Sequence, residues 1–186
     1  MLTLRFGVLA GAYFVICIGI YAISDPVCHT PFTLCSNDAD HYGYRVALTF
    51  QEFGSFRNYH DPSQPWVFWP PGFPIFYLSI VFLEVPRPLV VMTAVQVFLT
   101  FGMACMVRAA ALVILGKGKD LAFCLVAFNP LMLSLTFVPQ SDTLYAMLMA
   151  VGLLSLLLFL NRGRTTDILI VGVCFGVAAS VRVRSA

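Results

Sequence analysis

The feature that most constrains this chain is its long apolar run from Leu89 to Leu115, which carries a single charged side chain, Arg108. A helix that crosses a bilayer needs about 20 mostly apolar residues, because hydrocarbon offers its backbone groups no other hydrogen-bond partner. The run meets that length. Hydrophobic residues make up 60% of the 186-residue sequence and charged residues only 11%, so the same argument extends to the rest of the chain. We therefore predict an all-α integral membrane protein.

Further apolar segments on both sides of this run predict about five transmembrane helices in a single membrane domain. The expected spans are 4–23, 89–115, 121–138, 143–160 and 168–181. A helix break is expected within the third span, where a proline follows an asparagine. Because cytoplasmic loops carry an excess of Lys and Arg, the N-terminus is expected in the cytoplasm. The basic residues that set this orientation are Arg5, Lys117, Lys119, Arg162 and Arg164.

The first external loop, 24–88, holds the long polar segment of the chain and is where we expect the function. Apolar residues at helical spacing predict an amphipathic helix from Asp40 to Phe53 that lies along the membrane surface and ends at Gly54. The segment Phe73–Leu83 is apolar but only about half as long as a span requires. We expect it to form a re-entrant or interfacial helix.

Charge and cysteine usage narrow the class further. The net charge of +2 is too small, and too concentrated at loop ends, for a nucleic-acid surface, so no nucleic-acid partner is expected. Four of the six cysteines fall inside apolar runs, where a thiol usually serves as a small hydrophobic residue. Cys28 and Cys35 flank a short loop and would form a disulfide if that loop faces an oxidising compartment. Their spacing alone leaves the pairing open.

Asp38 and Asp40 form an acidic pair close to Tyr42 and Tyr44. One interpretation is that Asn37 or Asp38 caps the helix that follows, since both residue types are common at the N-cap. The other is that one carboxylate acts as a general base for an acceptor hydroxyl or amine. The second carboxylate would then orient the acceptor or help to hold a divalent cation. The two roles are compatible, and both remain open.

Two further groups in the loop have an ordinary and a functional interpretation. His60 with Asp40 is the candidate metal pair, although a single His in a polar loop is usually solvated. The aromatic residues Trp66, Phe68 and Trp69 are typical of a belt at the membrane interface, with stacking against a sugar as the alternative.

Two arginines follow the last predicted span. Arg182 and Arg184 are candidates to bind a lipid phosphate, because a guanidinium group pairs bidentately with phosphate oxygens. An ordinary flanking charge is the alternative. The predicted topology places these arginines, together with Ser141 and Asp142, on the same side of the membrane as the acidic pair.

Several short motifs occur in the order in which a known family carries them. Together they resemble the N-terminal part of a polytopic type C glycosyltransferase, of the group that contains protein O-mannosyltransferases and the aminoarabinose transferase of lipid A. The resemblance covers nearly the whole chain and rests on the order of the motifs. The motifs are Asp38-Ala39-Asp40-His41-Tyr42, Ala47, Gly54-Ser55-Phe56, Trp69-Pro70-Pro71-Gly72-Phe73-Pro74, Gln96, Asn129-Pro130, Ser141-Asp142 and Val181-Arg182.

The resemblance implies a polyprenyl-phosphate sugar as donor, an acceptor protein, lipid or glycan, and an acidic residue of the first external loop as catalytic base. Asp38 matches that base and Tyr42 its aromatic partner, while Asp40 with Tyr44 is a competing register. Arg182 matches an arginine that ends the fifth span. The further matched positions expected to contact substrate are Trp69, Gly72 and Asp142, the last of which stands where Glu is more common.

The expected function is therefore that of an inverting, mannosyltransferase-like membrane glycosyltransferase. We expect it to work on the periplasmic side of a bacterial inner membrane, or on the lumenal side of the endoplasmic reticulum membrane. Members of this family usually carry many more spans, so the chain is expected to be an N-terminal fragment. The alternative is a non-catalytic membrane subunit that binds a lipid phosphate or serves in assembly. A divalent cation is the one cofactor that the acidic pair suggests.

Overall fold

In the computed structural model, the described residues are 2–24, 45–58, 60–65, 72–84, 88–137 and 141–181. Over these ranges the chain is helical, with turns and one isolated β-bridge but no strand. The predicted all-α class is therefore confirmed. The helices are α1 (Leu2–Ser24), α2 (Arg45–Phe53), α3 (Gly72–Phe82), α4 (Pro88–Leu115), α5 (Lys119–Ala127), α6 (Pro130–Phe137), α7 (Ser141–Arg162) and α8 (Thr165–Val181).

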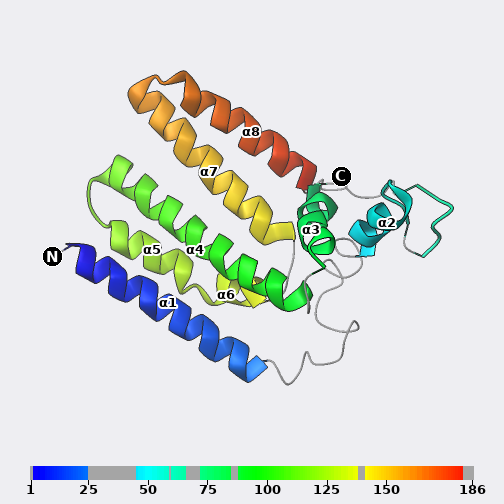
Figure 1. Cartoon of the computed structure of the whole chain (residues 1–186). Helices are drawn as coiled ribbons and strands as arrows, with labels where there is room; N and C mark the ends of the chain where they lie inside the picture. Colours follow the sequence, from blue (N-terminus) through cyan, green and yellow to red (C-terminus); the bar gives the residue numbers. More distant parts are fainter. Residues whose placement is uncertain are drawn as a thin grey trace.

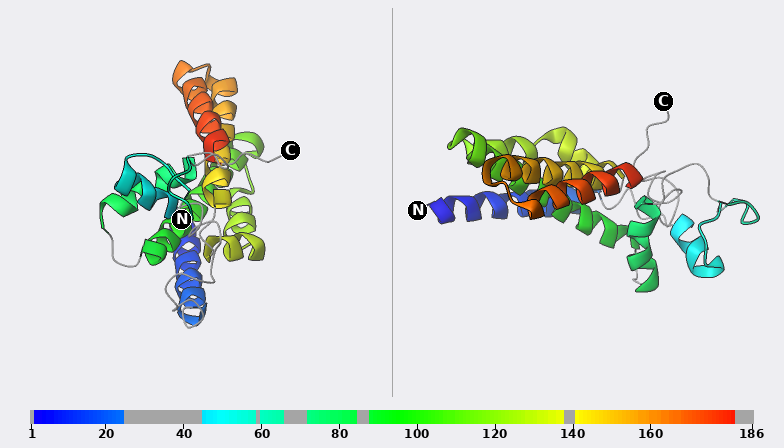
Figure 2. Two further views of the ribbon diagram at one scale, coloured as in Figure 1. Left: turned by 90° about the vertical axis from the view of Figure 1, so that its right-hand side faces the viewer. Right: turned by 90° about the horizontal axis from the view of Figure 1, so that it is seen from above.

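The long helices form an elongated row rather than a closed ring (Figure 1). Contacts run from α8 to α7, from α7 to α4 and from α4 to α5, and α1 lies beside α5 at the edge of the row. The left view of Figure 2 shows α8 and α1 at the two extremes of this row. Helices α4 and α5, and helices α7 and α8, are antiparallel neighbours, because a short loop joins the two members of each pair. Helices α4 and α7 run in the same direction, since α5 and α6 return the chain between them.

Two short helices, α2 and α3, lie beyond one end of the row. Both figures show α3 crosswise to the long helices, with α2 outside it (Figures 1 and 2). We call this the α3 end, and it also comprises the start of α7 and the end of α8. We call the opposite end the basic end. It holds Arg5 of α1, Lys119 at the start of α5, Arg162 at the end of α7, and Lys117 and Arg164 in the two loops there.

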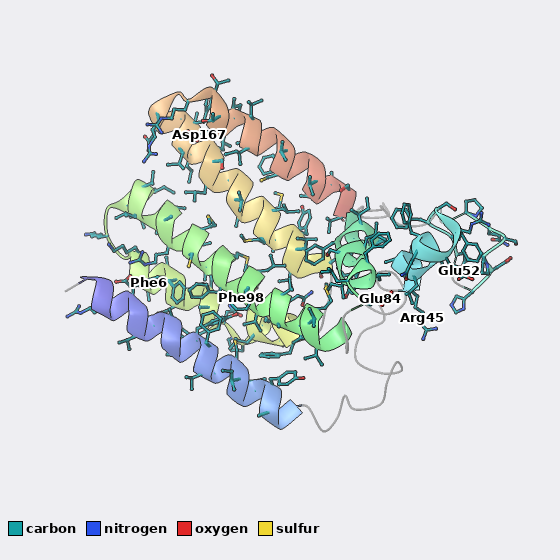
Figure 3. All side chains as sticks on the ribbon, in the orientation of Figure 1. Phe6, Arg45, Glu52, Glu84, Phe98 and Asp167 are labelled. Carbon is teal, nitrogen blue, oxygen red and sulfur yellow. The ribbon has the colours of Figure 1, made fainter. Side chains whose placement is uncertain are left out.

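Figure 3 shows the same division through the labelled side chains. Arg45, Glu52 and Glu84 lie at the α3 end, Phe6 and Asp167 lie at the basic end, and Phe98 lies between them. The labelled charged groups thus mark the two ends of the row, while apolar side chains occupy its middle. This distribution suits a molecule whose middle is surrounded by lipid.

Among the residues that the structure describes, three helices are long and apolar enough to cross a membrane by length and composition. They are α1, α4 and α7, over Arg5–Ala22, Val90–Leu115 and Ser141–Arg162. The helices α3 and α8 are apolar but shorter. The structure is therefore consistent with a membrane protein, and the count of five spans stays a prediction.

The third predicted span is divided into α5 and α6, as its asparagine and proline predicted. The side-chain oxygen of Asn129 accepts a hydrogen bond from the amide of Leu131 at 2.9 Å, so Asn129 caps α6. Pro130 stands at the first position of that helix, where the missing amide hydrogen costs nothing. The break therefore has a local cause.

Three helices end at a glycine in the left-handed conformation. Gly54, Gly116 and Gly163 have φ angles of 66°, 67° and 65°, and each donates its amide to the carbonyl four residues earlier. Only glycine adopts this conformation without a steric penalty, which is why it ends helices. The predicted end of the surface helix at Gly54 is confirmed. Its predicted first residues, 40–44, lie outside the described residues.

Two hydrophobic clusters hold the molecule together. The first joins α1, α4, α5 and α6 around Tyr13 and Phe123, both fully buried, and it is rich in edge-to-face aromatic pairs such as Phe6 with Phe123 at 5.4 Å. The second lies at the α3 end around Tyr77 and Met92, which are also fully buried. The second cluster draws residues from α2, α3, α4, α7 and α8.

Candidate functional site

Most of the residues predicted to carry chemistry lie outside the described residues. The structure describes Gly72, Asp142 and His60 and the helices that flank the others. The predicted positions outside the described residues are Asp38, Asp40, Tyr42, Tyr44, Trp69, Arg182 and the cysteine pair Cys28 and Cys35. The described helices that adjoin these positions in the sequence form the framework of the candidate site.

That framework is the second hydrophobic cluster, at the α3 end. Its buried members come from α2, α3, α4 and α8, and Leu144, Tyr145 and Leu148 of α7 pack against them. Five helices are thus fixed to one another by apolar burial, which contributes roughly 25 cal/mol per Å² of apolar surface buried. The buried members are Ala47, Phe73, Tyr77, Ile80, Val81, Met92 and Val181.

At Gly72, α3 comes into close contact with α8. A Cβ atom added at Gly72 would lie 2.5 Å from the hydroxyl oxygen of Ser180 and 2.6 Å from its carbonyl oxygen. Both distances are shorter than carbon and oxygen tolerate, and the carbonyl belongs to the backbone. Gly72 is thus the residue that lets the start of α3 rest on the last turn of α8, directly before Val181 and Arg182.

Asp142 lies in the first turn of α7 and is half-buried. The next residue, Thr143, is 3% exposed, and within the described ranges its hydroxyl has no hydrogen-bond partner. Tyr145, one turn further along, packs against the second cluster. The structure therefore brings Asp142 to the same end of the row as Gly72 and the end of α8. Gly72 and Asp142 are the predicted substrate contacts that lie within the described residues.

The surface helix α2 is held by its buried side and extended by an ordered loop. Thr49 is buried, and its hydroxyl donates to the carbonyl of Val46 at 2.8 Å and accepts from the amide of Arg57 at 3.0 Å. The guanidinium of Arg57 lies over the ring of Phe53, 5.0 Å from its centre, and donates to the carbonyl of Pro62 at 3.0 Å. These contacts fold the chain back onto α2 before it continues towards α3.

The tip of this loop is organised around Asp61. Its carboxylate accepts hydrogen bonds from the hydroxyl of Ser63 at 2.6 Å and from the side-chain amide of Gln64 at 2.8 Å. Hydrogen bonds from Ser63, and then from Gln64, hold the pKa of the Asp61 carboxyl below its ordinary value, because they favour the charged form. Asp61 is thus occupied in shaping the loop.

His60, the predicted metal ligand, is exposed, and its backbone amide donates to the side chain of Asn58 at 3.0 Å. Within the described ranges, no three His, Cys, Asp or Glu side chains come close enough together to hold a metal ion. Its predicted companion Asp40 lies outside those ranges. The metal pair therefore stays a prediction.

Sequence reasoning missed a set of hydroxyl groups inside the first cluster. The hydroxyls of Thr100 on α4 and Thr136 on α6 are 2.8 Å apart, and both residues are fully buried. The hydroxyl of Tyr13 on α1 donates to the carbonyl of Val97 at 3.0 Å. Threonine and tyrosine within apolar runs are the available signal, since a buried hydroxyl needs a partner that lipid does not supply.

Sequence reasoning also missed an ion pair at the basic end. The Nε of Arg108 lies 2.9 Å from the carboxylate of Asp120 on α5. The pair forms because the loop after α4 turns the chain back and brings the start of α5 beside α4.

Comparison with known proteins adds no relative: no family model, no curated protein and no solved structure matches this chain.

Proposed function

We propose that this chain is a membrane glycosyltransferase, or the N-terminal part of one, that transfers a sugar from a polyprenyl-phosphate donor to an acceptor at the α3 end. The order of the sequence motifs supports this proposal. One observation carries it further: the contact with Ser180 joins Gly72, a member of the Trp69–Pro74 motif, to the end of α8, which precedes Arg182 in the sequence. The shared cluster adds the start of α7, which bears Asp142.

The proposed chemistry is a single displacement. Asp38 or Asp40 removes the proton of an acceptor hydroxyl or amine, and the freed electron pair attacks the anomeric carbon of the donor sugar. The bond between that carbon and the phosphate oxygen breaks, and the polyprenyl phosphate leaves with its electron pair. Because attack comes from the face opposite the phosphate, the configuration inverts.

The remaining proposed residues bind the two substrates. Arg182 holds the donor phosphate, since its guanidinium matches two phosphate oxygens at once. The aromatic residues Tyr42, Tyr44 and Trp69 contact sugar or acceptor, and Asp142 accepts hydrogen bonds from sugar hydroxyls. The carboxylate of the acidic pair that is not the base orients the acceptor or holds a divalent cation.

The proposed orientation places the basic end in the cytoplasm, because cytoplasmic loops are rich in Lys and Arg. The α3 end then faces the periplasm of a bacterial inner membrane, or the lumen of the endoplasmic reticulum in the alternative. In either case the donor reaches the site from the bilayer, through its polyprenyl chain.

The test is sugar transfer in membranes that contain the chain in its full-length context. Radiolabelled polyprenyl-phosphate hexoses are supplied, and label transferred to protein, lipid or glycan is measured. Asp38→Asn and Asp40→Asn are compared with Asp61→Asn, a carboxylate of the same external loop that is already engaged by Ser63 and Gln64. Loss of the base is expected to lower transfer by about 10²–10⁴-fold.

The Asp61→Asn variant is expected to transfer sugar at the wild-type rate. If neither Asp38→Asn nor Asp40→Asn slows transfer, the assigned base is wrong. If the wild-type chain retains the labelled lipid but transfers nothing, the chain is instead a non-catalytic subunit that binds a lipid phosphate.

A further inference from the structure

Arg108 is held from two sides at the basic end. Its guanidinium carbon lies 4.2 Å from the centre of the Phe6 ring on α1, and its Nε donates to Asp120 of α5 at 2.9 Å. A ring face attracts a guanidinium, and a carboxylate attracts it more strongly. Three helices therefore fix both the position and the plane of this group.

The fixed guanidinium keeps donors in reserve. It has five N–H donors, of which Asp120 takes the one on Nε. Within the part of the chain that the structure describes, neither terminal nitrogen forms a hydrogen bond or ion pair. The Arg108 side chain is 21% exposed, so it reaches the surface. Two parallel N–H groups on one edge match two oxygens of a phosphate.

The surroundings of Arg108 favour an anion. Arg5 and Lys117 are exposed and Lys119 is half-buried, while Asp120 is the carboxylate on the same helices at this end. The cations outnumber that carboxylate, so an added phosphate meets a net positive field. Asp120 occupies the Nε side of the guanidinium and leaves the opposite edge to the ligand.

The surroundings are also apolar, which identifies the source of the phosphate. Helix α5 runs from Lys119 at the basic end towards the middle of the row. It exposes Leu121 and Leu125 by 64% and 65%, on the inner side of Asp120. A lipid whose phosphate meets Arg108 therefore has apolar side chains beside its acyl chains, a contact that free phosphate does not make. We propose that Arg108 binds the phosphate of an anionic phospholipid at the basic end, separately from any sugar transfer at the α3 end.

The experiment uses the whole chain, purified and delipidated in a neutral detergent. Phosphatidylglycerol and phosphatidylcholine with identical acyl chains are titrated in turn, and native mass spectrometry measures how much of each lipid the protein retains. Wild type is expected to retain phosphatidylglycerol in preference. Arg108→Gln is expected to weaken that retention by about tenfold, because charge-assisted hydrogen bonds are lost.

A matched control and a conservative variant complete the test. Arg164→Gln removes an exposed cation from the other loop of the basic end and is expected to bind phosphatidylglycerol like wild type. Arg108→Lys keeps the charge but not the planar pair of donors, and a several-fold loss is expected. This variant also decides the matter if Arg108→Gln does not fold, which thermal unfolding reveals.

The proposal is wrong if wild type retains both lipids equally. It is also wrong if Arg164→Gln loses as much binding as the Arg108 variants, or if Arg108→Lys binds like wild type. A fourth result concerns the source of the phosphate: if inorganic phosphate alone displaces the lipid, the acyl chains are not part of the site. The measurement involves no sugar donor, so its failure leaves the proposed transferase activity untouched.

Discussion

At the scale of single residues, position 72 has no room for a side chain. It belongs to the Pro-Pro-Gly turn that the sequence marks, and its structural reason is the backbone of Ser180 at the end of α8. No local pattern reveals that reason, because the two residues meet only after α3 and α8 dock. Sequence reasoning identified the residue, and the structure supplies the contact that explains it.

Gly72→Ala is expected to destabilise the protein by about 1–3 kcal/mol, as overpacking does, because the added Cβ forces α3 away from α8. Thermal unfolding of the purified protein measures the change. The matched control is Gly176→Ala in α8, where a Cβ would meet nothing within 4 Å. That control is expected to leave the free energy of unfolding unchanged or to raise it by about 0.5–1 kcal/mol, since alanine is a better helix former than glycine. Equal stability of Gly72→Ala and Gly176→Ala would show that α3 does not rest on α8 in this way.

At the scale of helices, the sequence predicts most boundaries well, since apolar runs end at Gly, Pro and Asn residues whose effects are local. Gly54, Gly116 and Gly163 each end a helix, and Asn129 begins one. Partnership between helices is not local. The pairing of Arg108 with Asp120 depends on how the loop after α4 folds back, so the apolar run around Arg108 does not predict it.

The contact between α4 and α6 is a place where helix partnership can be measured. Thr136→Val removes the partner of the Thr100 hydroxyl. Thr100→Val removes one partner of the Thr136 hydroxyl, which still donates to the carbonyl of Met132 at 2.6 Å, and the double variant removes both hydroxyls. We expect a coupling free energy of about 0.6 kcal/mol between the two positions, the average for hydrogen bonds between membrane helices. A double-mutant cycle of unfolding free energies gives this value.

Thr143→Val is the control for the α4–α6 cycle. The Thr143 hydroxyl is buried without a hydrogen-bond partner, so its replacement by a methyl group is expected to be neutral or stabilising. Additive effects at Thr100 and Thr136, with no coupling between them, would mean that the two hydroxyls do not bond.

At the scale of the whole molecule, all the loops at the basic end should lie on one side of the membrane and the α2 loop on the other. Fluorescent-protein fusions after Gly163 are expected to fluoresce, because that end is predicted to be cytoplasmic. Alkaline phosphatase fused after Gln64 is expected to be active, because it requires an oxidising compartment. The reverse pattern, with active phosphatase at Gly163, would invert the orientation and move the proposed site to the cytoplasm.

The overall class was accessible from sequence because it rests on composition and on the length of apolar runs. The candidate site was accessible only in part. The signals around Gly72 and Asp142 are local, and the structure places both at the α3 end through the second hydrophobic cluster. The hydroxyl pair of Thr100 and Thr136 escaped prediction, since threonine is common in membrane helices and only the packing of α6 against α4 makes these two adjacent.

The elongated row of helices has a consequence for the physical state of the protein. Helices at the middle of a closed bundle are solvated mainly by other helices, whereas in the described part of this chain α1 and α8 form opposite edges and expose apolar side chains such as Val15 and Val173. The bilayer is therefore part of the protein's packing. A change in acyl-chain length or lateral pressure acts along the whole perimeter at once, and with it on the spacing of the helices that frame the α3 end.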